Sequence, residues 1–170
     1  MSRLFFALWP DEKTRKQIAN VFKQFEQQKL KLVKNSNLHI TLEFLGEVSD
    51  HDRNALIDKT SRLNHKSFDL ELTEAGWWPK PQILWIGTSQ VPTSLLELVK
   101  SVRQCVRQQG IKTDSREYKP HVTVARKVKR KIHINEPFHI PWHVDRFVLV
   151  ESKTFESGVE YQVTREWPLN

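Results

Sequence analysis

The chain of 170 residues contains a single cysteine, Cys105. One thiol can form no disulfide within the chain and cannot build a cysteine-based zinc cluster, so both kinds of scaffold are excluded. The sequence also lacks any apolar run near the roughly 18 residues that a membrane helix needs. The apolar part of its N-terminus, residues 4–8, is too short for a signal peptide. We therefore expect a cytoplasmic protein with no membrane partner.

Acidic residues are outnumbered by basic ones. Lys and Arg total 27 against 20 Asp and Glu, which gives a net charge of +7 and a pI near 9.6. Such a charge is typical of proteins that bind phosphates, although a merely soluble basic protein would also show it. Apolar residues make up 38% of the chain, a globular composition. With no low-complexity tract or long linker, the chain is expected to form one domain over residues 1–170.

Hydrophobic periodicity predicts strands interspersed with helices. Strands are expected over residues 4–8, 38–45, 68–72, 83–86, 122–124, 147–150 and 159–163. Helices are expected to begin near Pro10, at Ser49 and at Thr93, with Thr93 as the cap of the third helix and Gly110 as its stop. Cys105 lies on the apolar stripe of that helix, which favours core packing. The order of elements favours an α+β fold with mainly antiparallel sheet.

The most informative pattern is His-x-Thr, which occurs in two of the expected strands. His39 and Thr41 form the first copy, and His121 and Thr123 form the second. Residues i and i+2 of a strand share a face, so each histidine is expected beside its threonine. The flanking apolar residues are expected to face the core: Leu38, Ile40, Leu42, Phe44, Val122 and Val124. Two copies with such flanks arise by chance in about two chains per thousand.

Paired histidines suit phosphodiester chemistry. Imidazole titrates near neutrality, so one ring can remove a proton from the attacking oxygen while another gives a proton to the leaving oxygen. A threonine hydroxyl on the same face can donate a hydrogen bond to a phosphate oxygen. The alternative is two ordinary half-exposed strands whose polar faces happen to match. The two halves of the chain also echo each other, because each has a helix followed by a His-x-Thr strand.

These motifs identify a family resemblance that covers nearly the whole chain. The chain resembles the two-histidine (2H) phosphoesterases, and within them the bacterial and archaeal RNA 2′,3′-cyclic phosphodiesterases, also called 2′-5′ RNA ligases. The similarity is carried by residues 37–48 and 120–126, with support from residues 3–8 and 161–169. It implies a bilobal α+β domain in which two mainly antiparallel sheets flank a central groove and helices pack outside.

The resemblance also implies an activity. It implies hydrolysis of the terminal 2′,3′-cyclic phosphate of RNA, such as tRNA fragments, to a 2′-phosphate, with reversible 2′-5′ ligation. No metal, cofactor or obligate protein partner is implied. His39 would be the proton donor to the departing 3′ oxygen, and His121 would be the base that activates water. The motifs are nearly symmetric, so the residues alone leave the acid and base assignment open.

The resemblance assigns phosphate binding to three further residues. Thr41 and Thr123 would hold phosphate oxygens, and Arg126 also matches the family pattern. Strict alternation places Arg126 on the face opposite His121, so its role requires a bulge or a strand end. Lys34 lies where the family often has arginine. The basic run over residues 126–131 could contact an RNA backbone or form a solvated loop.

Other functions remain open from the sequence. A 2H esterase could instead act on a small cyclic nucleotide or a sugar phosphate, and a non-catalytic module could bind RNA through its basic charge. Trp77, Trp78 and Trp142 could stack on bases, although packing in the core or in a turn is favoured for them. Pro141, which lies between His139 and His143, argues against a helical metal pair there.

Overall fold

The computed structural model describes the backbone of residues 1–170 and the side chains of residues 1–25 and 28–170. Its strands are β1 (Ser2–Leu8), β2 (Lys31–Leu32), β3 (Ile40–Val48), β4 (Phe68–Leu72), β5 (Glu74–Trp78), β6 (Ile83–Gly87), β7 (His121–Arg126), β8 (Ile140–Val144), β9 (Arg146–Phe155) and β10 (Gly158–Pro168). Its helices are α1 (Glu12–Phe22), α2 (Asp50–Thr60) and α3 (Thr93–Gln108), with 3₁₀ segments η1 (Lys23–Gln28) and η2 (Asn35–Asn37). None of the helices in this described part is long and apolar enough to cross a membrane.

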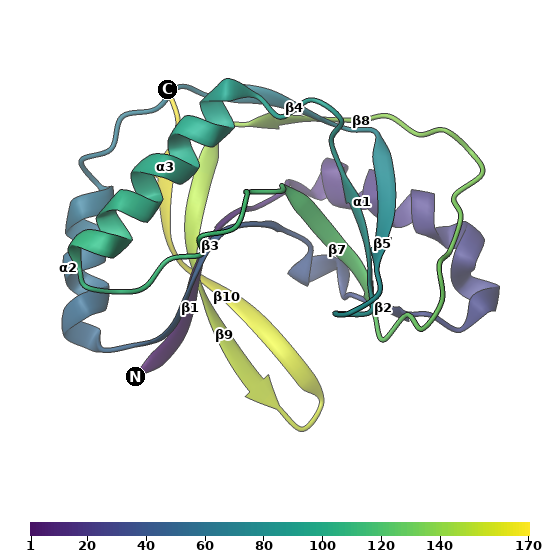
Figure 1. The fold of residues 1–170 in the computed structure, drawn as a ribbon, viewed down its shortest axis with the longest axis horizontal. Coiled ribbons are helices and arrows are strands. Elements are labelled where there is room, and N and C mark those ends of the chain that lie inside the picture. Colours follow the sequence, from purple (N-terminus) through teal and green to yellow (C-terminus); the bar gives the residue numbers. More distant parts are fainter.

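The strands form two antiparallel sheets, which confirms the α+β class. The larger sheet has the order β10-β9-β1-β3-β7-β6-β5, with β2 added beside β7, and β4 pairs with β8 in the smaller sheet. The two halves of the larger sheet meet where β3 pairs with β7, and this junction is a single register pair, Ile40 with Val122. Figure 1 shows the β9–β10 hairpin projecting at the bottom of the view, with strands β7 and β5 above it to the right.

Helix boundaries follow local capping. The Asp11 side chain accepts a hydrogen bond from the Thr14 backbone N–H at 2.7 Å, and Ser49 caps α2 in the same way. Gly110 has a φ of +76° just beyond α3, a conformation that ends a helix at little cost for glycine. The expectation that Thr93 caps α3 is wrong. Pro92 occupies the capping position with extended backbone, so Thr93 is already the first helical residue.

The core occupies both faces of the larger sheet. The main cluster lies between one face and the helices, and it includes Ile40, Leu42 and Val122. A smaller cluster on the other face contains Phe5, Ala7, Val148 and Val150, with Trp9 and Tyr161 packed against it. Strand β1 lies between β9 and β3, so its residues from Leu4 to Leu8 are buried on both faces. The second face is the one on which the candidate site lies.

Three short strands were not predicted from the sequence. Strand β2 has only two residues, and β5 contains Gly76 between residues that show no alternation. Buried and exposed residues alternate along β8, but Pro141 argued against a strand there because proline is rare within strands. Cys105 and Trp142 are buried in the core, as expected.

Candidate active site

The β3–β7 register brings the two His-x-Thr motifs together. Because Ile40 opposes Val122 in an antiparallel pair, extending this register by one residue in each direction places His39 opposite Thr123 and Thr41 opposite His121. All four side chains are half-buried on the same face, since Ile40 and Val122 are fully buried behind them. The two histidines are therefore diagonal neighbours, whose Cα atoms in such a pair lie about 7–8 Å apart.

Each motif strand contains a bulge just after its threonine. Thr41 and Glu43 pair with Ala7 and Phe6, which are consecutive residues of β1, so Leu42 is the extra residue of β3. The register with β6 similarly leaves Val124 as the extra residue of β7. A bulge of this kind reverses the alternation of the residues that follow it. The residue five positions after each histidine is thereby turned back to the histidine face.

These bulges change the positions of two residues. Phe44 was expected in the core but has 61% of its surface exposed, because the bulge at Leu42 turns it to the site face. There its ring centroid lies 5.5 Å from that of Phe5. Arg126 needed a bulge to face the site, and the bulge at Val124 supplies it. Arg126 lines the same hollow as His39 and Thr123.

Two hollows lie beside the motif residues. The His39 pocket has a volume of about 560 Å³, and its lining includes the basic residues Arg3, Lys31, Lys34 and Arg126. Among the side chains that the structure describes, no carboxylate lines it. The His121 pocket is larger, at about 800 Å³, and contains Thr41 and Trp78. Phe44 lines both hollows and so marks the boundary between them.

The His39 ring is held by its backbone and by aromatic neighbours. Its Nδ1 lies 2.6 Å from the Asn37 carbonyl oxygen, which can only accept, so Nδ1 carries the hydrogen. Nε2 is then unprotonated in the neutral ring and accepts from the Thr41 hydroxyl at 3.1 Å. Trp9 stacks on the imidazole at a centroid distance of 5.8 Å, and Tyr161 meets it edge-on at 5.2 Å.

The His121 ring is anchored in the same way. Its Nδ1 lies 2.7 Å from the Lys119 carbonyl oxygen, again two residues before the histidine. Trp78 packs edge-on against it at a centroid distance of 4.6 Å and also contacts Trp85 at 5.0 Å. Trp85 lies over Gly76, where a Cβ atom would come within 2.2 Å of the indole ring. Both motif histidines therefore hold the tautomer in which Nε2 is free of hydrogen.

Burial favours the neutral form of both rings. It lowers the pKa of His39 to about 4, against the opposing effect of the Asn37 hydrogen bond, and the charge of Arg126 lowers it further. Burial also lowers the pKa of His121, against the Lys119 hydrogen bond, and Arg126 adds to that decrease. An anion bound between the rings would favour the charged forms and raise both pKa values.

Comparison with known proteins gives the family. The model of the family described as "LigT like Phosphoesterase" matches the chain twice, over residues 8–85 and 86–161. The chain belongs to this family. Each matched half carries one His-x-Thr motif, in agreement with the internal echo of the sequence.

Individual relatives match over nearly the whole length. The RNA 2′,3′-cyclic phosphodiesterase of Escherichia coli is 31% identical, covering 98% of this chain and 96% of its own. The protein of that name from Methanocaldococcus jannaschii is 29% identical, with coverages of 97% and 99%. A crystal structure of E. coli LigT in apo form has a TM-score of 0.91 at 31% identity, covering 99% of this chain and 97% of that one.

The other candidate residues of this LigT-like phosphoesterase lie in different places. Lys34 lines the His39 pocket. Trp78 is half-buried at the end of β5, just before a turn, and it lines the His121 pocket. The Trp77 Nε1–H donates to the Val128 carbonyl at 2.8 Å. Val128 is buried, which anchors the basic run, and Arg126 is the member of that run found in the described pocket linings.

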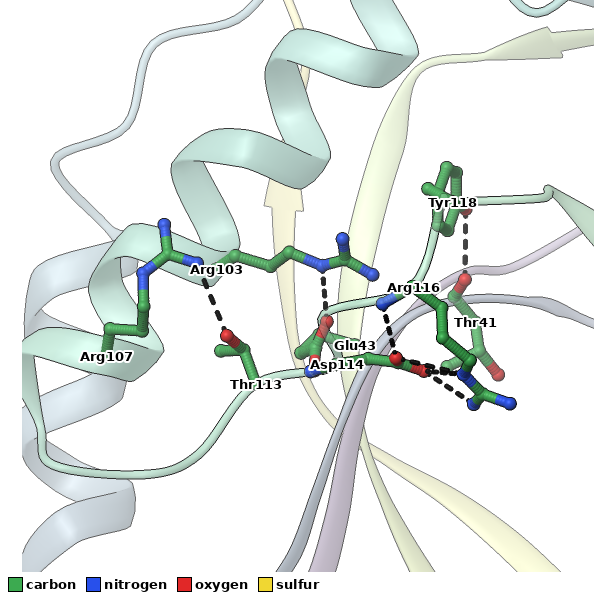
Figure 2. A network of polar contacts seen from close by, with 8 residues as sticks. All are labelled: Thr41, Glu43, Arg103, Arg107, Thr113, Asp114, Arg116 and Tyr118. Atoms are coloured by element: carbon green, nitrogen blue, oxygen red, sulfur yellow. Dashed lines mark hydrogen bonds and ion pairs between the residues drawn. The ribbon is translucent and has the colours of Figure 1, made fainter.

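A buried polar network connects the two motif strands (Figure 2). The Glu43 side chain, 2% exposed, accepts from Arg103 Nε at 2.6 Å and from the Asp114 backbone N–H at 2.7 Å. The Tyr118 hydroxyl donates to the Thr41 carbonyl at 3.0 Å. The network thus ties the segment before His121 to strand β3. The sequence offered no signal for it, because Glu43 reads as an exposed position of an alternating strand.

We expect Glu43→Gln to destabilise this LigT-like phosphoesterase. The substitution removes the charge partner of Arg103, whose side chain is only 16% exposed. The free energy of unfolding should fall by on the order of 2–3 kcal/mol, somewhat less than for a fully buried pair because Arg103 keeps some contact with water. Urea denaturation measures this change in the free energy of unfolding. Arg103→Met added to Glu43→Gln should recover part of the loss, and an unchanged midpoint for Glu43→Gln alone would contradict the account.

Proposed function

We propose that this protein hydrolyses the terminal 2′,3′-cyclic phosphate of RNA to a 2′-phosphate through its two motif histidines. The observation that carries the proposal is the β3–β7 register, which puts both imidazoles, each with its Nδ1 anchored, on one face with a threonine across from each. Relatives named RNA 2′,3′-cyclic phosphodiesterase support the substrate. Solved complexes of E. coli LigT with phosphate and with 3′-AMP support a phosphate site in this fold.

In the proposed reaction His121 acts as the base and His39 as the acid. Nε2 of His121 removes a proton from water, whose oxygen attacks the phosphorus. The bond from phosphorus to the 3′ oxygen breaks, and Nε2–H of His39 gives its proton to that oxygen. Each proton transfer contributes about 10²–10⁴-fold to the rate. The resemblance to the 2H family supplies the direction of this assignment.

The remaining site residues hold the phosphate. Thr41 and Thr123 lie across the strand pair from the two imidazoles and can donate hydroxyl hydrogen bonds to the non-bridging oxygens. Arg126, which lines the His39 pocket, can balance the charge that develops on those oxygens. The phosphate charge also explains how a buried His39 becomes protonated, since it offsets the burial that lowers its pKa. These side chains supply the proposed chemistry without a metal ion.

The pKa shifts predict an acidic optimum. In the productive free enzyme one imidazole is protonated and the other is neutral. The value of kcat/KM should therefore rise with pH through the lower pKa and fall through the upper one. His39 has a pKa of about 4 and that of His121 is below its ordinary value, so we expect a bell-shaped kcat/KM profile with its optimum below about pH 6.5. The optimum of kcat should lie higher, because the bound anion raises both pKa values. A kcat/KM that stays constant up to pH 8 would contradict this assignment.

The substrate is tested with two probes in EDTA. One probe is an oligonucleotide ending in a 2′,3′-cyclic phosphate, and the other is 2′,3′-cyclic AMP. We expect turnover of the oligonucleotide, with a 2′-phosphate as the product, at a kcat/KM well above that for the mononucleotide. Preferential turnover of the mononucleotide would indicate an esterase for small cyclic nucleotides. Tight binding without turnover would indicate a binding module, and a 3′-phosphate product would reverse the direction of bond cleavage.

The same site supports a reversible 2′-5′ ligation. In this reaction a 5′-hydroxyl group takes the place of water, while the roles of His39 and His121 are unchanged. The products are a 2′-5′ phosphodiester and a free 3′-hydroxyl, and the reverse reaction restores the cyclic phosphate.

A further inference from the structure

Arg15 carries a charge that is buried beneath the surface of the protein. Only 7% of its surface is exposed, and burial lowers the pKa of its guanidinium group. Among the described residues its side chain donates to two backbone carbonyls, and its Nη2 is buried without a hydrogen-bond partner. Burying a charge in this way is costly, and an apolar side chain would fill the same space at lower cost. Packing alone therefore does not explain why an arginine lies here.

The Arg15 side chain joins the two segments that lead to His39. Arg15 lies near the start of α1, and helical side chains lean toward the N-terminus of their helix. Its Nε donates to the Pro10 carbonyl at 3.0 Å, and its Nη1 donates to the Asn35 carbonyl. Pro10 lies between β1 and α1, whereas Asn35 begins the turn η2 just before His39. One guanidinium group thus links the end of β1 to the turn that enters the site.

The turn η2 supplies the carbonyl that orients the His39 ring. It is a single turn of 3₁₀ helix, which has little stability of its own. Its last residue, Asn37, places its carbonyl oxygen 2.6 Å from His39 Nδ1, and the Asn37 side chain donates to the Val159 carbonyl at 3.0 Å. Arg15 holds the first residue of the turn, Asn35. Loss of the guanidinium group should therefore let the Asn37 carbonyl move away from the imidazole.

A second connection from Arg15 to His39 runs through Trp9. The Arg15 Cζ lies 4.9 Å from the centroid of the Trp9 ring, within the range of a cation–π interaction. Trp9 in turn stacks on the His39 imidazole, with an angle of 21° between the two rings. To rotate about its Cβ–Cγ bond, the imidazole would have to turn its edge into the stacked indole. A half-turn about that bond would take Nε2 away from Thr41, and the stack opposes it.

We propose that Arg15 is a positioning residue for His39, which holds Trp9 and the turn η2 in place so that the imidazole keeps one orientation and one tautomer. This role goes beyond the proposed function, and only its kinetic consequences rest on that function. His121 serves as an internal reference, because its Nδ1 is anchored separately, by the Lys119 carbonyl.

The tautomers of the free protein give a test that needs no turnover. Nitrogen NMR shifts distinguish an imidazole with its hydrogen on Nδ1 from one with its hydrogen on Nε2. At neutral pH we expect wild-type His39 to carry its hydrogen on Nδ1, and Arg15→Met to show a mixture of both tautomers. The His121 signals should be the same in both proteins. An unchanged His39 tautomer in folded Arg15→Met would overturn the proposal.

A double-mutant cycle separates positioning from a general loss of stability. Arg15→Met should lower the single-turnover rate on a cyclic-phosphate oligonucleotide by about tenfold, with less than about a twofold change in the half-saturating concentration, because small displacements of a catalytic group are costly. In a His39→Ala background the same substitution should cost less than about twofold, since no imidazole is left to position. Rates are compared at the optimum pH of each variant, because burial lowers the pKa of His39 and the Arg15 charge adds to that decrease. Equal losses in both backgrounds would show that Arg15 acts independently of His39 and would overturn the proposal.

Matched variants separate the planar fork of Arg15 from its charge. Lys16→Met removes an exposed charge from the next position of α1 and should change neither the tautomers nor the rate. Arg15→Lys keeps the charge but lacks the fork that reaches both carbonyls, so we expect only part of the rate to return. Full recovery would mean that charge alone matters, which contradicts the proposed role.

Trp9→Leu tests the second connection and remains informative if Arg15→Met does not fold. It removes the ring that stacks on His39 but leaves the two carbonyl hydrogen bonds of Arg15 in place. We expect a mixture of His39 tautomers in this variant as well. A single wild-type tautomer in both Trp9→Leu and Arg15→Lys would overturn the proposal.

Failure of this proposal differs from failure of the proposed function. If the wild-type protein turns over the cyclic phosphate while folded Arg15→Met keeps the wild-type tautomer and rate, the positioning role is overturned and the hydrolase stands. If the wild-type protein shows no turnover, the proposed function is overturned, and the His39 tautomers still decide whether Arg15 positions the ring.

Discussion

His121→Ala and His39→Ala should each lower kcat for a cyclic-phosphate oligonucleotide by at least about 10²-fold, because each removes one of the two proton transfers. Both residues sit at the β3–β7 junction, and both keep Nε2 directed to the reaction by anchoring Nδ1 on a backbone carbonyl. The rates are measured under single-turnover conditions, so that product release does not hide the chemical step.

Folding is the necessary control for these variants. His39 packs against Phe5, Trp9 and Tyr161, so His39→Gln serves as a second variant that fills more of the same space. His143→Ala removes an exposed imidazole that pairs with Asp69 on the smaller sheet, and it should leave the rate unchanged. Near-normal rates in a folded variant of either motif histidine would remove that residue from the mechanism.

Arg126→Ala should lower kcat/KM by about 10²-fold, comparable to the loss of one donor to a developing oxyanion. Arg126 lies on the site face through the bulge at Val124 and is close enough to lower the pKa of both motif histidines. Its removal should therefore also shift the acidic limb of the kcat/KM profile to higher pH, which a purely structural role would not do. Steady-state kinetics across pH measure both effects.

A matched variant separates the role of Arg126 from the general charge of its segment. Lys129→Ala removes one charge from the same basic run but from an exposed position that lines neither pocket, and it should change kcat/KM by less than about twofold. Arg126→Lys should restore part of the rate, because it keeps the charge but loses the planar fork. Equal losses for Arg126→Ala and Lys129→Ala would mean that only net charge matters.

The local pattern of the sequence was enough to place each histidine beside its threonine. Period-two alternation is a property of a single strand, so His39 with Thr41 and His121 with Thr123 could be assigned to shared faces without knowledge of their neighbours. The α+β class followed from the order of strands and helices for the same reason. What the two motifs do together depends on the pairing of Ile40 with Val122, which lie far apart in the chain.

The bulges show where local reasoning fails. Strict alternation put Phe44 in the core and Arg126 on the wrong face, because an extra residue in a strand is visible only against its pairing partner. The same applies to Glu43, whose burial depends on Arg103 and on the backbone of Asp114 from distant segments. Both bulges lie three residues after their histidine, at Leu42 and at Val124, and this repeat is visible only in the strand pairing.

The most direct test of the account is a histidine NMR titration with 2′-AMP, the smallest analogue of the proposed product. If one phosphate lies between the two motif imidazoles, the Nε2 signals of His39 and His121 should both shift on binding, and both pKa values should rise from their lowered positions in the free protein. The exposed His143 ring should not respond. A response confined to one of the two motif histidines would contradict the claim that they act on the same phosphorus.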